Sequence, residues 1–145
     1  MTESPRLSSE ELRELLEGRH LAIISTNGSD GVPHSTPVWF MPEDDGAISM
    51  IVDEGAVKLR NLRRDPRASV TIAPETMPYR YARFRGRAEL LTEGVEDYPL
   101  RMAQRYLGER RGREWLGDPA AHPPFVVVRL KDAHPDTWKD PTGEA

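Results

Sequence analysis

AVKLRNLRRDPRAS, residues 56–69, is the stretch from which the fold of this chain is read. Five of its fourteen residues are Lys or Arg, although the whole chain of 145 residues carries a formal net charge of -4. Leu59 and Leu62 are three residues apart, as on one face of a helix. Asp65-Pro66 ends that helix, because the residue before a proline is disfavoured in the α region. We therefore expect a short basic helix at 56–64, with Asp53 available as its cap, and a strand at 67–74.

Short apolar or alternating segments on both sides of this helix predict strands. The segment YRYARFRGRAELL alternates between polar and apolar residues, so that one face of its strand packs inward. Turn sequences such as NGSDGVP and DDG connect the first three strands as hairpins. Hairpin links favour an antiparallel barrel over a doubly wound sheet. About six strands are expected, at 21–26, 34–43, 47–53, 67–74, 79–91 and 125–130.

Two further helices complete the expected α+β domain, which is mainly β and spans residues 1–145 as one unit. The first occupies most of 1–18, where Ser8 and Glu11 can form a capping box. A late helix is expected at 95–108 because Tyr98, Met102 and Tyr106 form one stripe. The segment 109–124 is interpreted as a loop, and 131–145 as a polar tail that contains Trp138.

The composition restricts the chemistry. Without Cys the chain has no disulfide, thiol nucleophile or Cys-based metal site, and its four His lack zinc-site spacing, so no metal is expected. Any redox chemistry must then come from a cofactor. No apolar run is long enough for a membrane helix, and the first twenty residues do not resemble a signal peptide, so a cytoplasmic protein without membrane contact is expected.

Lys58 lies in the first turn of the basic helix. Free N–H groups at a helix N-terminus and a lysine charge together form a phosphate cradle. Asn61 shares the face of Lys58 and could bond the same anion. The alternative is a solvated basic face, because no glycine-rich phosphate motif accompanies the segment. The arginines and aromatics of 79–87 also suggest a platform for single-stranded nucleic acid, but the net negative charge argues against nucleic-acid binding.

The motifs resemble those of one known family. The pattern K-x-x-N-L-x-x-D-P-R-x-S is matched by Lys58, Asn61, Leu62, Asp65, Pro66, Arg67 and Ser69. DGVPHSTPVWF is similar to the second strand of the same family, and FRGRAEL and FVVVRL follow in the expected order. Over about 21–140 the chain resembles the pyridoxamine 5'-phosphate oxidase-like proteins. The resemblance implies a split antiparallel β-barrel that binds a flavin or deazaflavin.

The resemblance also implies a homodimer with two cofactor sites at its interface. It places the cofactor phosphate at Lys58 with Asn61 adjacent, and Arg64 near an acidic cofactor tail, together with Arg60 and Arg63. The ring would lie along two strands, and the partner chain would close the pocket with Pro78, Tyr79 and Trp138. The strand residues expected at the ring are Ser35, Thr36, Pro37, Val38, Trp39, Ser49, Met50 and Ile51.

The identity of the cofactor rests on one departure from the family pattern. Some members have an arginine two residues before the lysine, and Ala56 occupies that position here, which removes one contact to phosphate. The missing arginine disfavours FMN more than a deazaflavin, and the segment NLRRDPR resembles the branch of the family that uses coenzyme F420. The expected function is hydride transfer between the reduced deazaflavin and an electron-poor small molecule. The alternatives are an FMN-dependent oxidoreductase and a protein that binds F420 or flavin without catalysis. No catalytic residue is assigned; His34 is a candidate proton donor or a solvated strand residue.

Overall fold

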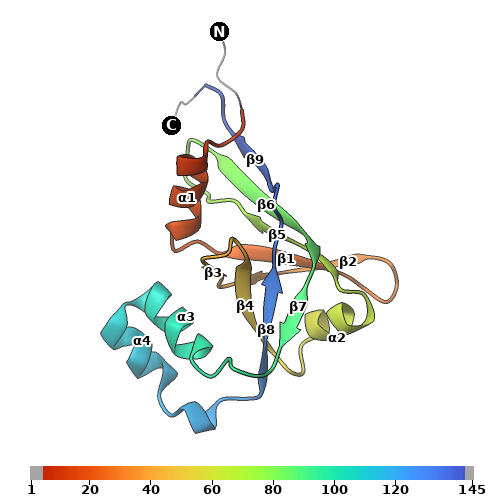
Figure 1. Cartoon of the computed structure of the whole chain (residues 1–145), viewed down its shortest axis with the longest axis vertical. Helices are drawn as coiled ribbons and strands as arrows, with labels where there is room; N and C mark the ends of the chain where they lie inside the picture. Colours follow the sequence, from red (N-terminus) through yellow and green to blue (C-terminus); the bar gives the residue numbers. More distant parts are fainter. Residues whose placement is uncertain (1–4, 143–145) are drawn as a thin grey trace.

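The computed structural model describes residues 5–142, which form two antiparallel sheets around one core (Figure 1). This is the α+β arrangement of a split β-barrel. The five-stranded sheet has the order β2 (Pro33–Val38), β1 (Ala22–Asn27), β5 (Arg67–Ile72), β6 (Arg80–Arg87) and β9 (Asp136–Lys139). The four-stranded sheet has the order β3 (Met41–Pro42), β4 (Ile48–Asp53), β8 (Phe125–Leu130) and β7 (Glu89–Leu91).

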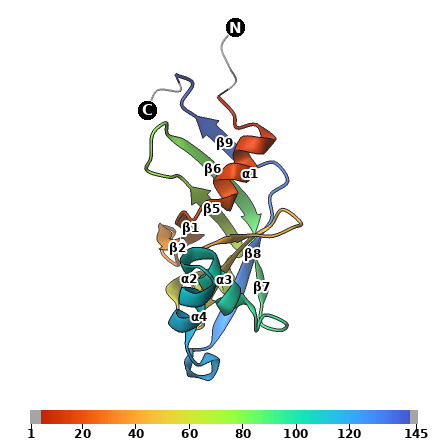
Figure 2. The same ribbon diagram turned by 90° about the vertical axis from the view of Figure 1, so that its left-hand side faces the viewer.

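The helices lie around this barrel and not between successive strands. They are α1 (Ser9–Glu17), α2 (Val57–Arg64), α3 (Tyr98–Leu107) and α4 (Glu109–Leu116), with a short 3-10 turn at Pro119–Ala121. Figures 1 and 2 show α1 and β9 toward one end of the molecule and the α3–α4 hairpin at the other. The expected capping box is present at α1, where the Ser8 hydroxyl accepts from the Glu11 N–H and the Glu11 carboxylate accepts from the Ser8 N–H.

The core is formed by alternate residues of the strands and by the apolar faces of α1 and α2. On β6 the predicted alternation is observed, since Ala82 and Phe84 are buried while Arg83 and Arg85 lie on the opposite face. Leu59 and Leu62 of α2 are buried, so the leucine spacing does orient the basic helix. Burial of such side chains contributes about 1.5–3 kcal/mol each, which holds α2 on the barrel.

Two of the expected strands bend from one sheet into the other. The segment 34–43 divides into β2 and β3 at Trp39-Phe40, where the Phe40 backbone bonds side chains of α3 and leaves the ladder. The segment 79–91 divides into β6 and β7 at Ala88, whose N–H donates to the Pro66 carbonyl. These two bends, together with β9, account for nine strands among the described residues where about six were expected.

The expected loop at 109–124 is wrong, because it contains α4. A glycine in the middle of a helix costs about 1 kcal/mol relative to alanine. Because of Gly112, the sequence of this segment did not predict a helix. In the structure Gly112 packs directly on the backbone of α3, where a Cβ atom would lie 2.6 Å from the Gln104 nitrogen. Only a residue without a side chain allows the two helices to approach so closely.

The expected polar tail is also more ordered than its composition suggested. It contains β9, which pairs with β6 in the register Tyr81↔Trp138. The carboxylate of Asp136 on β9 accepts from Arg83 at 3.0 Å, and the Tyr81 and Trp138 rings stack with centroids 6.2 Å apart. Cross-strand pairs of this kind stabilise an edge strand that lacks an apolar pattern.

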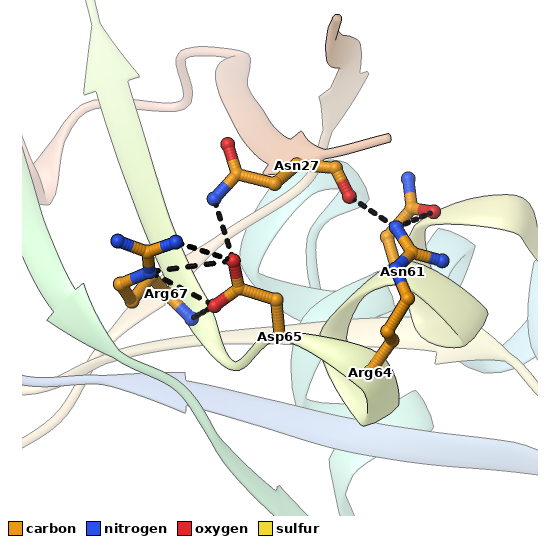
Figure 3. Close-up of polar contacts among 5 residues, drawn as sticks. All are labelled: Asn27, Asn61, Arg64, Asp65 and Arg67. Carbon is orange, nitrogen blue, oxygen red and sulfur yellow. Dashed lines mark hydrogen bonds and ion pairs between the residues drawn. The ribbon is translucent and has the colours of Figure 1, made fainter. Parts of the chain in front are cut away.

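The end of α2 is bound to β1 by a polar network (Figure 3). Asn61 is buried, and its Nδ2 donates to Thr26 Oγ1 at 3.1 Å. Arg64 donates to the Asn27 carbonyl, and the Asn27 side chain donates to Asp65 at 3.0 Å. Arg67 forms a bidentate pair with the same carboxylate (Figure 3). The second half of the basic segment is therefore a structural anchor.

Gly112→Ala is predicted to destabilise the protein by about 1–3 kcal/mol, because overpacking at the α3–α4 contact outweighs the better helix propensity of alanine. Urea unfolding followed by circular dichroism measures this change. Arg111→Ala, an exposed position on the same helix, is the matched control and should leave the unfolding free energy unchanged. An alanine variant as stable as the wild type would contradict the close packing of the two helices.

Asp65 should make the stability depend on pH in the acid range. Hydrogen bonds from Arg67 and Asn27 hold the pKa of the Asp65 carboxyl well below its ordinary value of 3.8. The unfolded chain therefore takes up this proton first, so the contribution is present above about pH 5 and is lost as the pH falls.

We expect the thermal midpoint of the wild type to fall more steeply between about pH 6 and pH 3 than that of Asp65→Asn. Asp44→Asn, at an exposed turn residue, should keep the wild-type slope. Equal slopes in Asp65→Asn and the wild type would show that this network does not carry the acid sensitivity.

Candidate functional site

A cavity of about 430 Å³ lies where the end of β2, the end of β4 and the start of α2 meet the α3–α4 hairpin. Most of its wall is apolar, and its charged side chains are Asp53 and Lys58. It is lined by Pro37, Val38, Trp39, Ile51, Val52, Asp53, Ala56, Lys58, Pro99, Met102, Ala103, Trp115, Leu116, His122, Pro123 and Phe125. The volume lies within the range of about 300–1,000 Å³ that is usual for ligand pockets.

Lys58 brings a positive charge to this cavity. Its Nζ donates to Thr36 Oγ1 of β2 at 3.2 Å, and within residues 5–142 it forms no ion pair with a carboxylate. The cap of α2 is Ala56 and not the expected Asp53, and Ala56 makes no side-chain cap hydrogen bond. The first N–H groups of α2 are therefore free of a side-chain acceptor beside a lysine, which is a favourable place for an anion.

Several of the expected ring-binding residues meet in this cavity. Pro37, Val38 and Trp39 line it from β2 and the bend that follows, and Ile51 lines it from β4. Thr36 contacts Lys58 at its edge. Strand and helix residues named from the family resemblance thus meet in one cavity. Their contact with a cofactor ring stays a prediction.

Other expected site residues lie elsewhere in the chain. Ser49 and Met50 are fully buried, Met50 within the main core. The Ser35 hydroxyl contacts that of Ser25 on the outer sheet face at 2.7 Å. Asn61 and Arg64 belong to the network between α2 and β1, so their contacts within the chain are structural. The cavity residues and these residues are close in sequence but differ in what surrounds them.

The residues expected from a partner chain lie apart from Lys58 within one chain. Pro78 and Tyr79 line a separate hollow of about 280 Å³ that also contains Arg80 and Lys139. Trp138 lies on β9 against Tyr81. His34 is on β2, with a shielded Nδ1 that has no hydrogen-bond partner among the described residues. Contributions of these residues to a cofactor site stay predictions.

The side of the cavity formed by the α3–α4 hairpin was not predicted from the sequence. The stripe Tyr98, Met102 and Tyr106 predicted α3, but the residues that follow were interpreted as a loop. Trp115 and Leu116 at the end of α4 line the cavity. The signal in the sequence was the apolar pair Trp115-Leu116 inside a strongly polar segment, which marks a buried or binding face.

Tyr106 fixes the orientation of Trp39. The two rings are parallel, with centroids 4.7 Å apart and an interplanar angle of 6°. The Tyr106 hydroxyl donates to the His20 carbonyl at 2.6 Å and accepts from the Phe40 N–H at 3.0 Å. Burial raises the pKa of the Tyr106 phenol, which keeps the hydroxyl protonated and able to donate at neutral pH.

Tyr106→Phe is predicted to destabilise the protein by roughly 1–3 kcal/mol, because it leaves the Phe40 N–H without its acceptor. Urea unfolding measures the change in stability. The tryptophan fluorescence of the protein should also change, because the ring that stacks on Trp39 is no longer held by its hydroxyl. The control Tyr98→Phe removes a hydroxyl for which the described residues show no hydrogen bond, and it should be neutral. Equal losses in both variants would argue against the specific role of Tyr106.

Neither a metal centre nor a membrane segment is apparent in the described part of the chain. No group of three or more His, Asp or Glu side chains in residues 5–142 is placed to hold a metal ion. Within the same residues no helix has both the length and the apolar character that crossing a membrane requires.

Comparison with known proteins gives one family match and many structural ones. The sequence model of the pyridoxamine 5'-phosphate oxidase family matches residues 8–139. An F420 reductase is 23% identical with a TM-score of 0.71, covering 86% of this chain and 94% of its own. An FAD-binding protein from Mesorhizobium loti is 20% identical with a TM-score of 0.65, covering 92% and 93%.

A third similar structure is the heme storage protein HutZ from Vibrio cholerae, which is 20% identical with a TM-score of 0.67 and covers 90% of this chain and 94% of its own. No curated protein matches the sequence at a significant level. At these identities the structural likeness establishes the fold, and the three structures carry different cofactors in their names. The choice between possible ligands must therefore be argued from the residues that line the cavity.

Proposed function

This chain belongs to the pyridoxamine 5'-phosphate oxidase family, and from this premise we propose that it binds coenzyme F420 in the cavity beside Lys58 and passes hydride to an electron-poor small molecule. The observation that carries the proposal is the position of Lys58. This lysine has no carboxylate partner among the described residues, and it lies in the first turn of an uncapped helix at the edge of an apolar cavity.

Electrostatics support an anionic group at this end of the cavity. The dipole of α2 and the ammonium of Lys58 are both positive there. Lysine binds phosphate as a point charge, and its hydrogen bond to Thr36 directs it toward β2 while leaving further N–H donors available. A phosphate or a similar anion would pair with an ammonium that forms no ion pair with a carboxylate in residues 5–142.

The apolar walls suit a planar ring system. Trp39, Ile51 and Phe125 come from three different strands or their ends and line one cavity. Such walls exclude water, which strengthens the electrostatic interactions at the polar edge of the ligand. When bound, the reduced deazaflavin supplies a hydride and a proton, so that the acceptor gains two electrons and the oxidised deazaflavin remains. The protein binds and orients both partners.

FMN is the second candidate, because the resemblance to the family implies a flavin or a deazaflavin. Ala56 argues the other way, because no second guanidinium lies beside Lys58 at the start of α2. The expected role of the arginines toward an acidic tail is restricted by their own contacts. Arg63 pairs with Glu54 at 2.7 Å, and Arg64 donates to Asn27. A protein that binds the cofactor without catalysis would use the same cavity, and turnover with added acceptors separates this case from an enzyme.

The expected homodimer belongs to the same proposal. Pro78, Tyr79 and Trp138 lie away from the cavity of their own chain, so they can reach a cofactor only from a second copy. Exposed apolar side chains on and beside the sheet of β1 and β2, namely Leu21, Ile23 and Val32, would lose contact with water in such a dimer. The mass in solution tests this part separately.

Titration of F420 and FMN into the purified protein tests the cofactor. We expect micromolar binding of F420, weaker binding of FMN, and a loss of roughly ten- to a hundredfold in Lys58→Ala, because one charge-assisted contact is removed. Lys131→Ala removes an exposed lysine that does not line this cavity and should bind as the wild type does.

The other outcomes are equally informative. If FMN binds more tightly than F420 and its binding depends on Lys58, the protein is an FMN-binding protein and the F420 proposal is wrong. Binding that is equal in Lys58→Ala and the wild type would remove the anion role of this lysine. If neither cofactor binds the wild type, the proposed function fails.

A further inference from the structure

We propose that Trp115 of α4 is the specificity-determining residue of this cavity and that, with Trp39, it selects planar, neutral aromatic molecules as acceptors. The inference deepens the proposed function and rests on it for the role of acceptor. Binding of the aromatic molecule depends on Trp115 and Trp39, so it can be tested without a cofactor.

Trp39 provides a fixed surface. One face of its indole is covered by Tyr106 in a parallel stack, and Tyr106 is held by two hydrogen bonds to the backbone of other elements. Trp39 is therefore not free to reorient when a ligand enters. A fixed aromatic wall binds a ring without the entropy cost of ordering a side chain.

Trp115 is the second and more open wall. It lines the cavity, yet 60% of its surface is exposed. Its ring lies 5.4 Å from that of Trp39 at an interplanar angle of 48°, so the two indoles are splayed and not stacked on each other. A large aromatic side chain exposed at the edge of a cavity offers area that a ligand can bury. Aromatic pairs prefer offset or edge-to-face contacts at such separations.

The charges of the cavity divide between its two sides. Asp53 is the last residue of β4, and Lys58 lies in the first turn of α2. The hairpin contributes Pro99, Met102, Ala103, Trp115 and Leu116, none of which is charged. A charged molecule on the hairpin side would lose its hydration without gaining a partner there. This side therefore favours neutral molecules.

The hairpin holds Trp115 in place. Gly112, one turn before Trp115, lies against the backbone of α3, so the two helices form one closely packed unit. After α4, His122 donates its Nε2–H to the Leu116 carbonyl oxygen and fixes the end of the helix. Trp115 is thus a preorganised contact and not a side chain on a loose loop.

The test uses menadione, a planar neutral naphthoquinone, and camphorquinone, a non-planar neutral diketone, in calorimetric titrations of the cofactor-free protein. Trp115→Ala should bind menadione about tenfold more weakly than the wild type, because stacking and buried area are lost together. Trp115→Phe should retain most of the affinity, and Arg111→Ala on the same helix should be unchanged. Camphorquinone should bind more weakly than menadione and should not respond to Trp115→Ala.

Equal menadione affinity in Trp115→Ala and the wild type would overturn the inference, and so would the absence of menadione binding or a preference for camphorquinone. Thermal unfolding of Trp115→Ala should match the wild type, since the side chain is mostly exposed. F420 and FMN titrations of the same variant distinguish the two proposals. A wild-type protein that does not prefer menadione to camphorquinone, but binds the cofactor in a Lys58-dependent way, refutes the inference alone. Menadione selectivity without any cofactor binding refutes the proposed function alone.

Discussion

The arrangement of the site depends on the hydrogen bond from the buried Asn61 amide to Thr26. Asn61 donates to Thr26, Arg64 donates to the Asn27 carbonyl, and the Asn27 side chain donates to Asp65. Together these bonds fix the last turn of α2 against β1. A buried amide that lost these partners would cost about 1–3 kcal/mol, so the helix has one favourable position on the barrel. With that end fixed, the other end of α2 points its free N–H groups and Lys58 toward the cavity. The position of the proposed anion-binding end is thus a consequence of a structural network that begins three residues further along α2.

The same contacts explain why an acidic chain concentrates basic residues in one segment. Arg63 is neutralised by Glu54, Arg64 bonds to the backbone of Asn27, and Arg67 pairs with Asp65. Each of these charges is used within the chain, and none creates a general field for nucleic acid. Surface pairs of this kind are worth little individually, but they remove the charges from competition for a ligand. Lys58, like Arg60 and Arg64, bonds to a neutral oxygen and not to a carboxylate. Of these three residues Lys58 is the one that lines the cavity, so its charge is available to an anion there.

The sequence predicted the elements whose patterns are local. The leucine spacing of α2, the capping box of α1 and the alternation of β6 each depend on residues within a few positions of one another, and all three are present. It did not predict α4 or β9, because both depend on a neighbouring element. Gly112 lowers the helix propensity of α4, and the packing of α4 on α3 compensates for this. Trp138 lies in a strand because it pairs with Tyr81 on β6. The site divides in the same way: Lys58 and Trp39 were found from motifs, whereas Trp115 required the packing of two helices. A motif also cannot separate a ligand contact from a structural one, as Asn61 illustrates.

The cavity therefore combines two parts that the fold holds independently. The charged part depends on α2 and β1, while the apolar part depends on α3, whose Arg105 donates to carbonyls of Phe40, Leu16 and Gly18 and so joins the hairpin to α1 and to the bend after β2. Trp39 belongs to that bend and is the residue at which both parts meet. The hydrogen bonds of Asn61 and those of Arg105 have no residue in common. Substitutions on the cavity side of α4 can therefore change the apolar wall while the position of Lys58 stays fixed. A barrel of this design can keep one anion-binding end and vary the molecules it accepts at the other, since the varying residues lie on a hairpin that packs on the barrel from outside.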